Sequence, residues 1–81
     1  KVMKEILDTL RRHKENCRNA TTIDMANIYL GQLSGIEGCF YIVSVMGQTT
    51  EEYIKISDVF KKELEDARQI LSKKFESGKL R

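Results

Sequence analysis

The feature that most restricts the fold is a regular apolar stripe in the last third of the chain. Its members recur at steps of three and four residues: Tyr53, Ile56, Phe60, Leu64, Ala67, Leu71 and Phe75. This spacing places them on one face of an α-helix. Thr49 and Glu52 have the form of a capping box before the stripe, and Gly78 follows it as a C-terminal stop. The sequence therefore predicts a helix over residues 50–77.

A second apolar stripe opens the chain. Apolar residues recur at helical spacing from Met3 to Cys17, which predicts a helix over residues 2–17. The 81 residues include no proline, and 32% of them are charged. This composition suits long uninterrupted helices and argues against all-β folds built from short strands and tight turns.

A third helix is expected between these two. Thr21, with Asp24 three residues later, has the form of an N-cap followed by an acidic first turn. Gly47 stands where a left-handed glycine usually ends a helix. The middle helix is therefore expected over residues 22–46, and the short turn after it predicts a long antiparallel hairpin with the helix over residues 50–77.

The expected fold class is all-α, with one three-helix domain over residues 1–81. A domain of this size buries only about 60 to 65% of the surface of its unfolded chain, so oligomerisation would add needed stability. One alternative concerns residues 39–45, which are rich in β-branched and aromatic side chains and could form a strand. A lone strand would need a partner across a dimer.

The middle helix contains three glycines, which each cost a helix interior about 1 kcal/mol relative to alanine. On a helical wheel they form one smooth side together with two small polar residues; the set is Asn27, Gly31, Ser34, Gly35 and Gly38. Glycines four residues apart allow two helix backbones to approach closely. We therefore expect a homodimer or larger assembly whose two-fold axis passes near Gly35.

The glycines of the middle helix also allow three different structures. The smooth side could receive the first helix of the same chain, with no dimer at all. The glycines could instead mark a kink or a break between Gly31 and Gly38. A membrane span over residues 25–46 is disfavoured because Asn27, Gln32 and Glu37 interrupt the apolar sequence.

The sequence offers few residues for chemistry. His13 and Cys17 stand four residues apart on the first helix, and Cys39 could add a third metal ligand. Both His13 and Cys17 fall on the apolar stripe, however, which favours a core histidine and a buried thiol. We expect no metal site, no cofactor and no catalytic residues, because nothing supplies an orienting carboxylate or an oxyanion hole.

Basic residues line one side of the first helix. This basic ridge consists of Lys4, Arg11, Lys14 and Arg18. Its spacing could follow phosphates or bind an anionic ligand. The alternative is that Arg11 and Arg18 pair with Glu63 or Asp66, or simply keep the surface soluble.

The expected function is binding rather than catalysis. A net charge of +2 is far from the strong basic balance of a dedicated nucleic-acid binder. We expect a non-catalytic, homo-oligomeric helical module that acts through protein–protein interaction, as an adaptor, regulator or inhibitor. The alternative is a small nucleic-acid- or nucleotide-phosphate-binding protein that uses the basic ridge. Two cysteines and no signal-peptide pattern suggest a cytoplasmic protein without a membrane partner.

Overall fold

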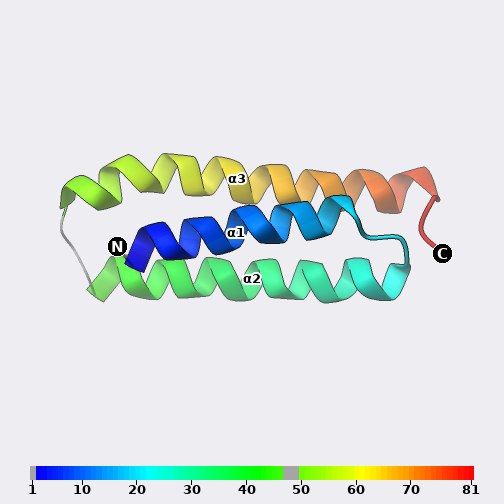
Figure 1. Cartoon of the computed structure of the whole chain (residues 1–81), viewed down its shortest axis with the longest axis horizontal. Coiled ribbons are helices and arrows are strands. Elements are labelled where there is room, and N and C mark those ends of the chain that lie inside the picture. Colours follow the sequence, from blue (N-terminus) through cyan, green and yellow to red (C-terminus); the bar gives the residue numbers. More distant parts are fainter. Residues whose placement is uncertain (1, 47–49) are drawn as a thin grey trace.

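The computed structural model describes residues 2–46 and 50–81, and it contains three α-helices within these ranges. Helix α1 spans Val2–Arg18, α2 spans Ile23–Met46 and α3 spans Thr50–Ser77. The helices lie side by side in a bundle with extents of 44 × 16 × 16 Å (Figure 1). The predicted all-helical class is confirmed, and each helix begins and ends within one residue of its expected position.

The hydrophobic core lies along the line where the three helices meet, and each helix contacts the other two. The buried apolar residues are Met3, Leu7, Leu10, Cys17, Ala20, Ala26, Leu33, Phe40, Phe60, Leu64, Ala67 and Leu71. Between α2 and α3, the rings of Phe40 and Phe60 stack with centroids 3.9 Å apart and planes 6° apart. The predicted stripe of α3 thus supplies a third of these buried apolar residues.

Helix α2 is continuous from Ile23 to Met46. Residues 39–45 are therefore helical, and the strand predicted as an alternative for them is wrong. A break between Gly31 and Gly38 is likewise excluded, because both glycines lie within the unbroken helix. Tertiary packing explains why α2 is continuous. Leu33 and Phe40, on its inner side, are both buried against the other helices, and this packing holds the segment with the glycines in one helix.

The start of α2 differs from expectation by one residue. The backbone amide of Met25 donates to Thr22 Oγ1 over 3.1 Å, so Thr22 is the N-cap and not Thr21. Two adjacent threonines have equal capping chemistry, and their order along the chain does not distinguish them. The expected Gly47 stop and Thr49 cap lie outside the described residues.

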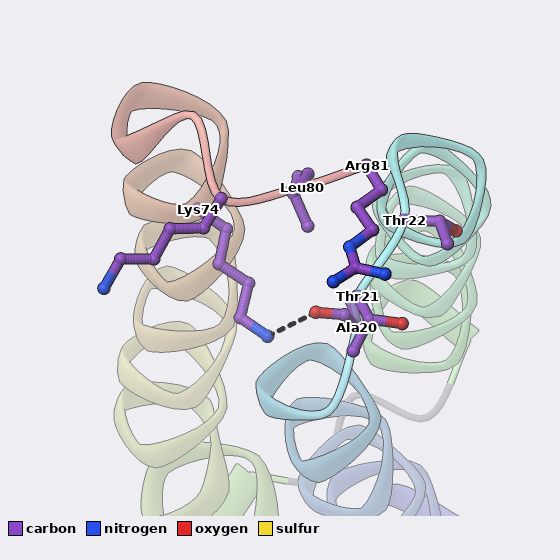
Figure 2. Close-up of a pocket in the computed structure, with 7 residues that line it drawn as sticks. Ala20, Thr21, Thr22, Lys74, Leu80 and Arg81 are labelled. Atoms are coloured by element: carbon purple, nitrogen blue, oxygen red, sulfur yellow. Dashed lines mark hydrogen bonds between the residues drawn. The ribbon is translucent and has the colours of Figure 1, made fainter.

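The C-terminal tail closes the end of the bundle where α1 joins α2 (Figure 2). Gly78 ends α3 with a φ of 69°, which confirms the predicted stop. Beyond it, the amide of Arg81 donates to the carbonyl of Thr21 over 3.1 Å, and the Arg81 carbonyl accepts from the amide of Ile23 over 2.9 Å. Lys74 Nζ of α3 donates to the Ala20 carbonyl over 2.7 Å. The loop between α1 and α2 is therefore held to α3 by direct hydrogen bonds.

Candidate helix–helix interface

The small residues of α2 lie on its solvent-exposed side. Asn27, Gly31, Ser34, Gly35 and Gly38 are all exposed. A Cβ atom built on any of these three glycines would have no atom of another residue within 4 Å, apart from its chain neighbours and its own helix backbone. Helix α1 therefore does not pack on the glycines, and the alternative in which they receive it is wrong.

Large apolar side chains surround these small residues, and sequence reasoning missed them. They are Ile28, Tyr41, Ile42, Val45 and Met46, with exposed fractions between 52 and 82%. At 100° per residue they fall on the same half of the helix as the glycines. We call these ten residues, the five small and the five large ones, the outward face of α2. The helical wheel could have revealed it, because both sets share one side.

The ten residues of the outward face are uncharged, and the exposed Asp24 lies beside the N-terminal end of this face. Between residues 25 and 46 the sequence has a single charged residue, Glu37. Its carboxylate turns toward α3 and accepts from Arg68 Nη2 over 2.7 Å. By length and composition α2 could cross a membrane, and only 11% of its most apolar 18-residue window is buried. An apolar helix that served only as the core of this bundle would be mostly buried.

A cleft between α1 and α2 opens beside the outward face. Its walls include Ile6 of α1 and Ile36 of α2, and Gly35 belongs to both the cleft and the outward face. His13 also lines it, with its ring edge-on to Tyr29 at a centroid distance of 5.5 Å. Burial lowers the pKa of His13, and a hydrogen bond to the Tyr29 backbone opposes this. Through Gly35 the cleft is continuous with the outward face.

Cys17, the other predicted core residue of α1, is fully buried. Burial raises the pKa of its thiol, while the nearby Lys74 ammonium acts in the opposite direction. Cys39, in contrast, is exposed and lines the cleft. Among the described residues, no group of three or more His, Cys, Asp or Glu side chains is placed to hold a metal ion.

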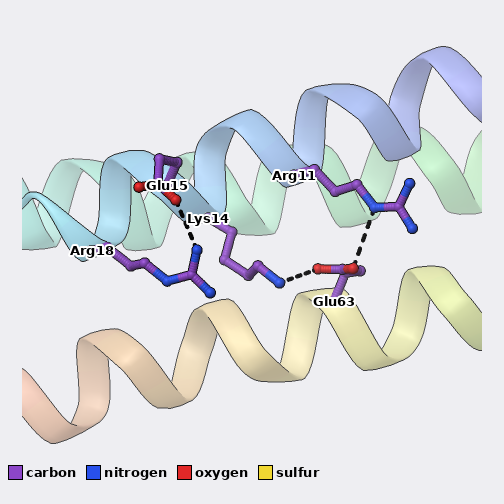
Figure 3. A network of polar contacts seen from close by, with 5 residues as sticks. All are labelled: Arg11, Lys14, Glu15, Arg18 and Glu63. Atoms are coloured by element: carbon purple, nitrogen blue, oxygen red, sulfur yellow. Dashed lines mark hydrogen bonds and ion pairs between the residues drawn. The ribbon is translucent and has the colours of Figure 1, made fainter.

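The basic ridge is paired with carboxylates of the same chain (Figure 3). Lys14 and Arg11 both contact Glu63 of α3, Arg11 through its Nε at 3.3 Å. Arg18 pairs with Glu15 at 2.7 Å. Lys4 lies 3.6 Å from Asp8. A phosphate bound to the ridge would compete with these ion pairs.

Glu63 is the centre of this network, and its side chain is only 18% exposed. The hydrogen bond from Lys14 lowers the pKa of the Glu63 carboxyl; burial opposes this, and Arg11 adds to the lowering. The network therefore stabilises the fold above the pKa of an unfolded glutamate, about 4.3. This stability is lost as the pH falls through the lower pKa of the folded state.

We expect the variant Glu63→Gln to lose about 1–2 kcal/mol of free energy of unfolding at pH 7, because two cations lose their shared carboxylate. At pH 3 the difference from the unmodified protein should shrink, since protonated glutamate resembles glutamine. Urea titrations at both pH values measure this. Glu65→Gln, at an exposed position on the same helix, is the matched control. An equal loss at pH 3 and pH 7 would contradict the electrostatic origin of this stability.

Comparisons of the chain with protein-family models, with curated proteins and with solved structures found no match. Function is therefore inferred from the surfaces of the bundle alone.

Proposed function

We propose that this chain is a non-catalytic binding module that works as a homodimer, joined through the outward face of α2. In this proposal α2 and α3 form an antiparallel hairpin in each copy, and two such hairpins meet along α2. The observation that carries the proposal is the exposure of Ile28, Tyr41, Ile42, Val45 and Met46 around an uncharged row of small residues.

The single bundle leaves this apolar face exposed at a cost in free energy. Monomeric soluble proteins rarely expose contiguous apolar patches larger than a few hundred Å². Burial of apolar surface contributes roughly 25 cal/mol per Å². In addition, the three glycines together cost about 3 kcal/mol of helix stability. No atom of another helix contacts the Cβ side of Gly31, Gly35 or Gly38, so nothing in the single chain offsets this cost. A close contact with a second α2 helix would offset it.

A second copy fits the outward face better than a lipid bilayer does. Asn27 and Ser34 lie among the apolar residues of this face, and Gln32 is exposed beside it. Polar groups without hydrogen-bond partners cost several kcal/mol in hydrocarbon. At a protein–protein interface they can bind to the partner or to water at the rim. A second α2 helix offers a surface of matching, uncharged character.

Protein partners are also favoured over nucleic acid. Each member of the basic ridge contacts a carboxylate of the same chain, and Glu63 neutralises part of the charge of Arg11 and Lys14. Nucleic-acid affinity depends on cations that are available to replace counterions on phosphates. In the proposed dimer, α1 and α3 remain exposed for a further protein, which is consistent with an adaptor or regulator in the cytoplasm.

The native cysteines provide a test without any mutation. Cys39 is exposed one helical turn after Gly35, whereas Cys17 is fully buried and serves as the internal control. We expect alkylation of Cys39 by a maleimide to slow as the protein concentration rises, because the partner covers it. Cys17 should remain unreactive until the protein unfolds.

A Cys39 alkylation rate that does not change with protein concentration would contradict the dimer. Protection of Cys39 that arises only when phosphatidylcholine vesicles are added would assign the outward face to a bilayer instead, and would equally overturn the proposal.

A further inference from the structure

The proposed dimer can be refined to a specific arrangement. We infer that two copies meet in antiparallel orientation about a two-fold axis at Gly35, so that Ile28 of each copy packs against Ile42 of the partner subunit. This inference rests on the proposed function. It adds the orientation and the residues that meet, which the exposure of the face alone does not define.

The positions of the residues along α2 support this axis. Gly35 lies at the middle of the helix, which runs from Ile23 to Met46. Ile28 precedes Gly35 by seven residues and Ile42 follows it by seven. Seven residues are almost two helical turns, so all three lie on one side. Their exposed fractions are nearly equal, 58% for Ile28 and 57% for Ile42. An antiparallel two-fold axis at Gly35 places each isoleucine opposite the other.

The distribution of bulk favours the antiparallel orientation over the parallel one. The second half of the outward face holds large exposed side chains, Tyr41, Val45 and Met46. The first half holds one large side chain, Ile28, beside the small residues Asn27, Gly31 and Ser34. In a parallel pair, the large side chains of the two copies would meet at one end and hold the helices apart. In an antiparallel pair each bulky half meets a half with mostly small residues, which allows close packing along the whole helix.

The charge at the start of α2 supports the same orientation. Asp24 is exposed and precedes Gly35 by eleven residues, close to three turns, so it lies toward the outward face. A parallel pair would bring the two Asp24 carboxylates together, and like charges at an interface are unfavourable. The antiparallel pair separates the two carboxylates by roughly 33 Å along the helix. At that distance salt largely screens the repulsion between surface charges.

Two charge substitutions test the arrangement. Ile28→Glu and Ile42→Lys, each alone, should weaken self-association roughly 30-fold or more, because each places a charge against an apolar partner residue. An equimolar mixture of the two variants should associate more strongly than either variant alone. In the mixed antiparallel dimer the introduced glutamate faces the introduced lysine, and the second contact remains isoleucine on isoleucine.

The double variant, with both substitutions in one chain, should regain self-association for the same reason. In a parallel dimer the mixture would leave every introduced charge without a counter-charge, and the double variant would place like charges together. Failure of the mixture and the double variant to associate would overturn the inference. Sedimentation velocity at matched concentration gives the readout, and circular dichroism of each variant verifies folding, since both positions are exposed. A failure of the proposed function itself is distinguishable, because the unmodified protein would then be monomeric.

Discussion

Replacing Gly35 with leucine is expected to dissociate the proposed dimer while it strengthens the single bundle. A Cβ at this position would meet no atom of α1 or α3 within 4 Å, and Gly35 is exposed at the edge of the cleft, so the single bundle has open space for a larger side chain. Leucine should raise the helix stability of the bundle by about 0.5–1 kcal/mol relative to glycine. At a two-fold axis the substitution places two leucines in a tight helix crossing. Overpacking of about 1–3 kcal/mol per copy would weaken association roughly 30-fold or more.

Ser72→Leu is the matched control for Gly35→Leu, because Ser72 is also a small exposed residue but lies on α3. The control should associate as the unmodified protein does. Sedimentation gives the association constant, and thermal unfolding followed by circular dichroism gives the stability of the bundle. A Gly35→Leu variant that stays fully associated would show that the glycine row is not the contact.

Replacing Phe60 with alanine should have the largest effect on folding. Phe60 is 2% exposed, and its ring stacks on that of Phe40. Loss of a buried phenylalanine leaves a cavity and typically lowers the free energy of unfolding by about 3–5 kcal/mol. Much of the stability of so small a domain would be lost, and the variant should be largely unfolded at physiological temperature.

Phe75→Ala provides the comparison for Phe60→Ala within the same predicted stripe. Phe75 is 39% exposed near the end of α3, so its removal should cost under about 1.5 kcal/mol. Urea titration of both variants, at one protein concentration, measures the two losses. Equal losses would mean that the Phe40–Phe60 contact does not anchor the core.

The helices were predictable because their apolar residues have a clear period. The stripe from Tyr53 to Phe75 points to one buried face, and Phe60, in its middle, is buried as expected. The end of α2 has no such period. From Tyr41 to Met46 most side chains are apolar, so their spacing alone marks no buried side. A helical wheel, however, places Val43 on the side of Leu33 and Phe40, and Val43 is half-buried there.

The interactions between helices were less predictable than the helices themselves. The pairing of Arg11 with Glu63 was one expected alternative, whereas the contact of Lys14 with the same carboxylate was not expected. Which of several acidic residues on α3 faces α1 depends on how α3 is rotated about its axis. The packing of the core sets that rotation. It cannot be inferred from the pattern of charges along one helix.

Sedimentation equilibrium of the unmodified protein tests most directly whether the outward face of α2 joins two copies of the chain. The measurement covers a range of protein concentrations at physiological salt. We predict twice the mass of one chain at high concentration, with dissociation on dilution. The apparent mass should change little with added salt, because the ten residues of the outward face are uncharged. A mass of one chain at every concentration would contradict the proposed dimer.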